Sequence, residues 1–185
     1  MNSNRSTVTR SLVLAALMAA LTAVCSQIQI PLPMVPINLA LFAVHLAGAL
    51  LGAKWGALSM AAYALLGAVG APVFGGFRGG PGVLFGITGG FLISYPLMAL
   101  IISAIVERAS AADKKAGLGI HVLAMAISLI FCYLFGALWF VVAAHATLEK
   151  AFAACVIPFV IPDLLKAVLA SAAAVAVKKR IALFR

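Results

Sequence analysis

The stretch GGFRGGPGVLFGITGG, from Gly75 to Gly90, holds eight of the sixteen glycines of the chain and a single arginine. The sequence on both sides is almost continuously apolar: 65% of the 185 residues are hydrophobic, 9% are charged, and the mean hydropathy is +1.21. Soluble domains carry about 25% charged residues, so the composition predicts a membrane protein. In lipid, such a stretch would leave backbone groups unpaired unless it packs against protein or lines a cavity.

The apolar segments around this stretch predict six membrane-spanning helices in one integral membrane domain, residues 1–185. The expected spans are residues 11–30, 38–51, 55–69, 88–106, 118–144 and 151–177. The expected fold class is therefore an all-α membrane protein, a six transmembrane helix bundle with a Gly-rich outer loop between helices 3 and 4. No small-residue cleavage site precedes Gln27, so we expect the first span to be retained rather than removed as a signal peptide.

The positions of the basic residues predict the orientation in the membrane. With both termini in the cytoplasm, the cytoplasmic segments hold ten of the 13 Lys and Arg residues: Arg5, Arg10, Lys54, Arg108, Lys114, Lys115, Lys178, Lys179, Arg180 and Arg185. Only Arg78 and Lys150 fall in outer segments. Cytoplasmic loops are enriched in Lys and Arg. We therefore expect a multi-pass protein of the cell membrane with cytoplasmic N- and C-termini, and we attribute the +9 net charge to topology rather than to nucleic-acid binding.

The sequence lacks the motifs of an enzyme or a metal site. No GxxxxGK[ST] motif occurs, so no ATP is bound through a P-loop. The cysteines and histidines are isolated and lack the spacing of zinc ligands; they are Cys25, Cys132, Cys155, His45, His121 and His145. We expect no enzymatic activity, no metal and no cofactor.

Asp163 and Lys166 are the charged residues that lie inside an apolar span. A charge at the centre of a spanning helix costs about 2.5–3.5 kcal/mol by insertion scales, and such residues usually mark a substrate path. In IPDLLKAV the two are three positions apart, so they share a helix face. Pro162 suits the first turn of a helix, which would put Asp163 near a positive helix N-terminus. The pair is either a structural ion pair or a partner for a polar ligand.

Arg78 is the charged residue of the glycine-rich stretch. An arginine in an outer loop can simply be solvated, but flanking glycines such as Gly79 let backbone N–H groups approach a ligand closely. Phe77 adds an aromatic surface, and Thr88 adds a hydroxyl where a helix begins and an anion is favoured. These residues predict that the loop is a lid or wall of an outward-facing cavity.

The block WGALSMAAYALLGAVGAPVFGGFRGGPGVLFGITGGFLISYP, Trp55 to Pro96, resembles the BioY family. That family supplies the biotin-binding membrane subunits, called S components, of energy-coupling-factor (ECF) vitamin transporters. The length, the expected six spans and the motif IPDLLKA also fit, so the resemblance covers nearly the whole chain. The chain departs from the family's usual Gly-Pro-Thr-Gly-Gly-Tyr at Ile87 and Phe91, where the proline and the tyrosine hydroxyl are missing.

The resemblance implies roles for the charged residues. Biotin has a ureido ring with two N–H donors and a carbonyl, a thioether ring, and an apolar tail that ends in a carboxylate. Asp163 would accept the ureido N–H bonds, and Lys166 or Arg78 would bind the carboxylate or the ureido oxygen. Phe77 and Tyr63 are candidates to face the rings, although an aromatic residue in a membrane helix can also serve packing alone. Asn38 is a further polar candidate.

Ala15, Ala19 and Ala23 stand four positions apart in the first span, with Ala16 and Ala20 alongside. A stripe of small residues lets another helix approach closely in lipid, either within the bundle or from a partner. In S components a similar stripe docks the transmembrane coupling subunit, which in turn joins two ATPase subunits. The resemblance therefore implies that these alanines contact a coupling subunit and that an ECF module supplies the energy.

The predicted function is the capture of biotin from outside and its delivery across the membrane, as the substrate-binding subunit of an ATP-driven ECF-type vitamin transporter. The alternative within transport is a solitary biotin channel or secondary carrier that works without an ATPase module. An intramembrane enzyme would need a nucleophile–base pair or a metal cluster, which the sequence lacks. A purely structural membrane protein would not need the charged pair.

Overall fold

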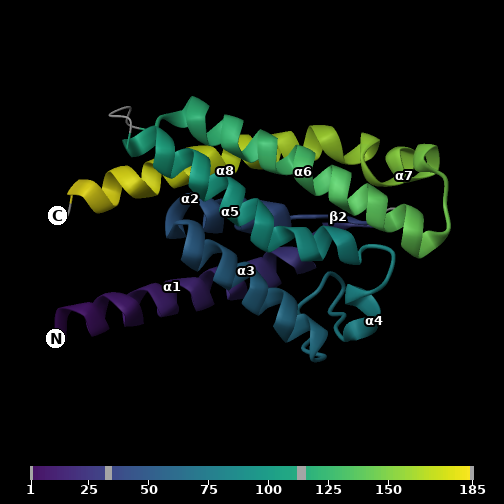
Figure 1. The fold of residues 1–185 in the computed structure, drawn as a ribbon, viewed down its shortest axis with the longest axis horizontal. Coiled ribbons are helices and arrows are strands. Elements are labelled where there is room, and N and C mark those ends of the chain that lie inside the picture. The colour runs from purple at the N-terminus through teal and green to yellow at the C-terminus, as the bar shows by residue number, and fades with distance from the viewer. Residues whose placement is uncertain (1, 32–34, 112–115, 184–185) are drawn as a thin grey trace.

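The computed structural model describes residues 2–31, 35–111 and 116–183, and this part of the chain is mostly helical (Figure 1). The helices are α1 (Asn2–Gln27), α2 (Ala40–Leu51), α3 (Ala53–Ala68), α4 (Pro81–Leu84), α5 (Gly89–Ala111), α6 (Leu118–Ala144), α7 (Leu148–Cys155) and α8 (Ile157–Leu183). A short antiparallel ribbon, β1 (Gln29–Ile30) with β2 (Ile37–Asn38), joins α1 to α2 and was not expected from the sequence.

Four helices are long and apolar enough to cross a membrane: residues Thr7–Gln27 of α1, then α5, α6, and residues Ile157–Arg180 of α8. These confirm a multi-pass membrane fold. α2 has 12 residues and α3 has 16, fewer than the about 20 that cross the hydrocarbon core. The described part of the chain contains eight helices rather than six. The count of six spans therefore stays a prediction.

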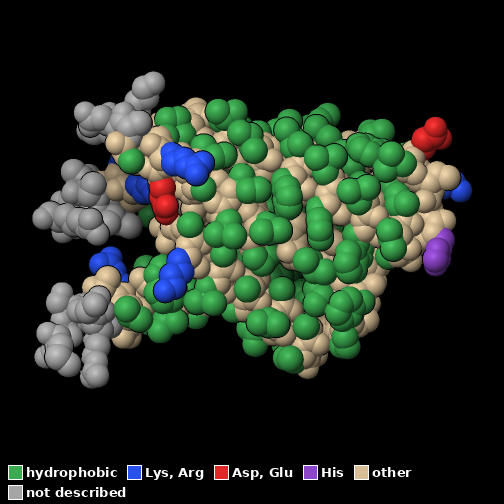
Figure 2. Space-filling model, viewed as in Figure 1, with side chains coloured by type: hydrophobic (Ala, Val, Ile, Leu, Met, Phe, Trp, Pro, Cys, Tyr) green, Lys and Arg blue, Asp and Glu red, His purple; other side chains and the backbone are tan. Residues whose placement is uncertain are grey.

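Both termini lie at the same end of the molecule (Figure 1). Figure 2 shows hydrophobic side chains over the middle of the visible face, with Lys and Arg gathered mainly at the end that holds the termini. This distribution suits a bundle embedded in lipid with its charges at the membrane surfaces. Three residues that the orientation argument uses, Lys114, Lys115 and Arg185, lie outside the described residues.

The expected last span, residues 151–177, is divided between two helices. α7 ends at Cys155 and α8 begins at Ile157, with the chain bending at Val156. α8 begins at Ile157, so Pro162 lies inside it rather than in its first turn, and Asp163 is its seventh residue. This corrects the prediction that Asp163 lies at a helix N-terminus, because the helix dipole acts mainly within the first turn. Its charge depends on side-chain partners instead.

Small residues and buried hydroxyls bring the helices close together, as expected between helices in lipid. Ser59 Oγ of α3 donates to the backbone oxygen of Ala15 in α1 at 2.6 Å, and Ser103 Oγ of α5 donates to Gly48 O of α2 at 2.5 Å. Gly90, the second residue of α5, lies directly against Trp139 of α6, where an added Cβ would overlap the Trp139 side chain. The start of α5 is thereby fixed against α6.

The alanine stripe of α1 faces the interior of the chain. Ala15 and Ala19 are each only 5% exposed, and Ala23 is half-buried against the same core. Ala15 and Ala19 therefore pack against other helices of this chain, the alternative that the alanine spacing had left open, and the contact of Ala15, Ala19 and Ala23 with a coupling subunit stays a prediction. The alanines that α1 exposes are Ala16 and Ala20, one position further along.

The glycine-rich stretch is ordered rather than one continuous loop. Phe74 and Arg78 exchange backbone hydrogen bonds of 2.9 and 3.2 Å and close a tight turn. Gly76 and Phe77 in this turn have φ angles of 73° and 55°; the first is natural for glycine, and the second is unusual for a side chain as large as phenylalanine. α4 follows the turn, and the stretch ends as the first residues of α5.

Candidate ligand-binding site

A cavity lies between the turn of residues 74–78, the first parts of α2, α5 and α8, the middle of α6 and the end of α7. Its polar lining residues are Asn38, Arg78, Thr88, Tyr133, Asp163 and Lys166. Its other lining residues are Val35, Pro36, Leu41, Phe74, Gly75, Val83, Phe91, Leu92, Tyr95, Cys132, Cys155 and Phe159. An apolar, aromatic lining with a few convergent polar groups is typical of small-molecule sites.

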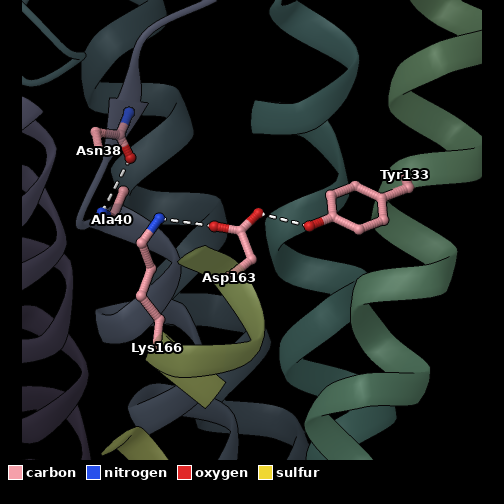
Figure 3. Close-up of polar contacts among 5 residues, drawn as sticks. All are labelled: Asn38, Ala40, Tyr133, Asp163 and Lys166. Atoms are coloured by element: carbon pink, nitrogen blue, oxygen red, sulfur yellow. Dashed lines mark hydrogen bonds and ion pairs between the residues drawn. The ribbon is translucent and has the colours of Figure 1, made fainter. Parts of the chain in front are cut away.

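A buried charged pair stands at the centre of this site (Figure 3). Lys166 Nζ lies 2.7 Å from Asp163 Oδ1, and the two residues are 7% and 1% exposed. The hydroxyl of Tyr133, from α6, donates to Asp163 Oδ2 at 2.8 Å. A buried carboxylate is stable only when it is paired and hydrogen-bonded. Each oxygen of Asp163 has one donor, and each oxygen therefore keeps further acceptor capacity.

Asn38 lies at the end of β2, where the chain enters α2. Its Oδ1 accepts the backbone N–H of Ala40 at 3.0 Å, which holds the first turn of α2 (Figure 3). The side-chain amide nitrogen takes no part in this bond, so its two N–H groups keep their capacity to donate hydrogen bonds. Asn38 therefore combines a local structural role with a place in the cavity lining.

Arg78 and Thr88 line the cavity from the glycine-rich stretch. Arg78 is exposed, and its Nε donates to Gly75 O at 3.0 Å, which folds the guanidinium back over the turn. Among the described residues no carboxylate lies within salt-bridge distance of this guanidinium. Thr88 directly precedes α5. The cation at the mouth of the cavity is therefore free to meet an anionic group.

Three further predicted site residues do not line the cavity. Phe77 is 73% exposed at the tip of the turn. Gly79 lacks a side chain because a Cβ would overlap the backbone of Ala71, so its role is to let two backbone segments approach. Tyr63 is buried behind the cavity, stacked on Tyr95 at 6.2 Å and edge-on to Phe74 at 5.5 Å between ring centroids.

Sequence reasoning missed the aromatic wall of the cavity and the second donor to Asp163. Tyr133, Tyr95 and Phe159 carry no signal in an apolar sequence that distinguishes them from residues that face lipid. The one available hint was the hydroxyl of Tyr133 in a span, since a buried tyrosine hydroxyl usually finds a partner. Phe91, which replaces the family's tyrosine, lies in the lining and packs against Gly136.

The arrangement suits a ligand with a polar head, an apolar body and an acidic end. The Asp163 carboxylate accepts hydrogen bonds from N–H donors, and Lys166 and Tyr133 fix its orientation. Aromatic and aliphatic side chains beside it favour a flat or apolar ring system. Arg78 offers a cation at the exposed end.

The family model and similar curated proteins in the comparison with known proteins point to one family. The model of the BioY family matches residues 1–183. A probable biotin transporter BioY from Pyrococcus horikoshii is 40% identical over 157 residues, which are 83% of this chain and 87% of the relative. The biotin transporter BioY from Thermotoga maritima is 38% identical over 175 residues, which are 92% of this chain and 96% of the relative.

A solved structure has the same fold. The crystal structure at 2.1 Å of the S-component for biotin from an ECF-type ABC transporter superposes with a TM-score of 0.86 at 25% sequence identity. The match covers 97% of this chain and 95% of that one. The helix arrangement described above is therefore similar to that of this S-component over nearly the whole of both chains.

Proposed function

The chain belongs to the BioY family, and from this premise we propose that it is the biotin-capture subunit of an ECF-type transporter. It binds biotin and delivers it across the membrane. The observation that links this function to particular residues is the buried Asp163–Lys166 pair, which lines a largely apolar cavity.

The ureido ring is the part of biotin that fits the charged pair. Its two N–H groups are donors, and Asp163 is a buried acceptor whose oxygens each have one donor already. The ureido carbonyl can accept from the Lys166 ammonium, which has three N–H donors and uses one on Asp163. The thioether ring then meets aromatic side chains of the cavity lining, namely Phe74, Phe91 and Tyr95.

Arg78 is the better candidate for the biotin carboxylate. Lys166 is committed to Asp163, and transferring it to a second carboxylate would leave Asp163 with one charged partner fewer in a buried site. Arg78 lies at the exposed rim and has no such commitment among the described residues. The guanidinium can also bind a carboxylate through two parallel N–H bonds.

Energy would come from an ECF module, made of a transmembrane coupling subunit and two ATPase subunits. The exposed Ala16 and Ala20 of α1 offer a small-residue face in lipid where a coupling helix can approach. Biotin would enter from the outside, with both termini in the cytoplasm, and would be released inside when the module reorients the subunit.

Isothermal titration of the purified full chain with biotin, in detergent and without ATP, tests the assignment. Capture precedes energy input, so we expect a submicromolar Kd, which corresponds to about −8 kcal/mol or stronger. Weak binding or none by a sample that elutes as a folded protein would refute the biotin function. Uptake at full rate into vesicles that contain this chain and no ATPase subunit would favour the solitary carrier instead.

A further inference from the structure

The side chain of Gln27, the last residue of α1, reaches across to the turn that closes the ligand cavity. Its Nε2 lies 3.2 Å from Phe74 O and 3.3 Å from Val73 O, and it also contacts Ala23 O and Ser26 Oγ within α1 at 3.0 and 2.9 Å. Its Oε1 accepts the backbone N–H of Phe77 at 2.8 Å. One amide group thus bonds both arms of the turn, across 46 to 50 positions of sequence.

The turn is closed locally by the two backbone hydrogen bonds between Phe74 and Arg78, but its residues do not all favour this conformation. Two of its residues are glycines, Gly75 and Gly76, and Phe77 holds a positive φ of 55° that costs energy for a side chain of this size. The N–H that Gln27 accepts belongs to this same strained residue. The hydrogen bond from the Phe77 N–H to Gln27 therefore adds to the two backbone bonds between Phe74 and Arg78 that close the turn.

The turn is also a wall of the site. Phe74, Gly75 and Arg78 all line the cavity, and the guanidinium of Arg78 folds back on Gly75 O. If the turn moved outward, the aromatic wall and the rim cation would move with it. Gln27 does not line the cavity itself, so any effect on the ligand passes through the turn.

Gln27 is not the only contact between these segments. Ser26 Oγ donates to Val73 O at 2.7 Å, and Tyr63 Oη donates to the same oxygen at 3.2 Å. Both hold the start of the turn, at Val73. Gln27 differs because it alone of these three also bonds Phe77, near the tip of the turn.

We propose that Gln27 is a positioning residue for the ligand site. Its side-chain amide holds the turn of residues 74–78 against the end of α1 by hydrogen bonds and so slows the dissociation of bound ligand. Gln27 acts on the residence time of the ligand without touching the ligand. The inference rests on the proposed function only for the identity of that ligand, since these hydrogen bonds are a property of the protein without ligand.

Gln27→Met tests the role of these hydrogen bonds, because methionine has a length similar to that of glutamine but no side-chain N–H donor and only a weak acceptor. Ser59→Ala is the matched control: it also removes one buried hydrogen bond between α1 and α3, to Ala15 O, far from the turn. Two measurements are made on the full chain in detergent. One is hydrogen exchange of the amides in residues 74–78 without ligand, and the other is the dissociation rate of radiolabelled biotin chased by unlabelled biotin.

We expect Gln27→Met to raise both the exchange rate of the Phe77 amide and the dissociation rate of biotin by about tenfold, the factor that one net hydrogen bond of about 1.4 kcal/mol provides. Ser59→Ala should lower the melting temperature without changing either rate. Unchanged exchange in Gln27→Met, or an equal acceleration in Ser59→Ala, overturns the proposal.

Gln27→Glu keeps the test decisive if Gln27→Met does not fold. Glutamate keeps an acceptor for Phe77 N–H but places a second carboxylate oxygen against Phe74 O, which it repels, so biotin should leave faster than from the parent protein. An unchanged dissociation rate of biotin from Gln27→Glu would contradict the proposal. If the parent protein binds no biotin, the proposed function fails, and hydrogen exchange still decides whether Gln27 holds the turn.

Discussion

The hydroxyl of Tyr133 on α6 donates a 2.8 Å hydrogen bond to one oxygen of Asp163 on α8, while Lys166 binds the other oxygen at 2.7 Å. Two donors on opposite oxygens leave the carboxylate no freedom to rotate. An acceptor that is already oriented loses less entropy when a ligand binds. Tyr133 therefore links α6 to the predicted head-group site on α8.

Tyr133→Phe should weaken biotin binding by about tenfold, because hydrogen bonds to charged groups contribute about 1.5–3 kcal/mol and part of this orients Asp163. Isothermal titration measures the change. Ser128→Ala is the control on the same helix: it removes a buried hydroxyl that bonds Met125 O and lies outside the cavity lining. Equal affinities of Tyr133→Phe and the parent would show that this bond serves only the fold.

Asp163→Asn should lower the biotin affinity by about 1.5–3 kcal/mol, since the ureido N–H groups lose a charged acceptor. It also leaves Lys166 buried without its partner, which destabilises the fold. The double variant Asp163→Asn/Lys166→Met removes both charges and should regain thermal stability, because replacing a buried ion pair with neutral groups is often close to neutral.

The double variant separates the structural from the functional interpretation of the pair. If it is stable and binds no biotin, the pair belongs to the ligand site. A stable double variant with the affinity of the parent would mean that Asp163 and Lys166 only hold α8 in the bundle. Melting temperature and titration on the same samples supply both numbers.

The long helices could be predicted from the sequence, and the short elements could not. α5 and α6 are continuous apolar runs, and hydropathy alone finds them. The break at Val156 lies inside an equally apolar run, where no charge or glycine marks it. Pro158 and Pro162 were visible, but proline fits either the first turn of a helix or its interior in a membrane, so neither fixed where α8 begins.

The charged residues of the site could be predicted because charge is costly in lipid, and this cost gives Asp163 and Lys166 a clear signal. The face of α1 could not be predicted in the same way. Ala15 and Ala16 look alike in sequence, and only the packing of α1 against α2 and α3 shows that the first is buried and the second exposed. The spacing of the alanines predicts that they share one face of the helix, but it does not predict whether that face points into the bundle or toward lipid.

Arg78→Gln should weaken the binding of biotin by about fivefold, since a partly exposed ion pair contributes up to about 1 kcal/mol. The same variant should bind biotin methyl ester, which has no carboxylate charge, as well as the parent does. Raising the salt concentration should reduce the difference between the two proteins for biotin. An equal loss for biotin and its ester would assign Arg78 to the shape of the turn rather than to the carboxylate.

The burial of α1 predicts opposite outcomes for two neighbouring alanines. Ala20 is exposed, so Ala20→Trp should leave folding and biotin binding by the isolated chain intact while it blocks the close approach of a coupling helix. Ala19 is 5% exposed in the core, so Ala19→Trp should overpack the bundle and lower its melting temperature. Co-purification with the coupling subunit and ATP-driven biotin uptake in vesicles measure the first effect, and thermal unfolding measures the second. If Ala20→Trp assembles and transports at the parent's rate, the coupling subunit does not dock on this face of α1.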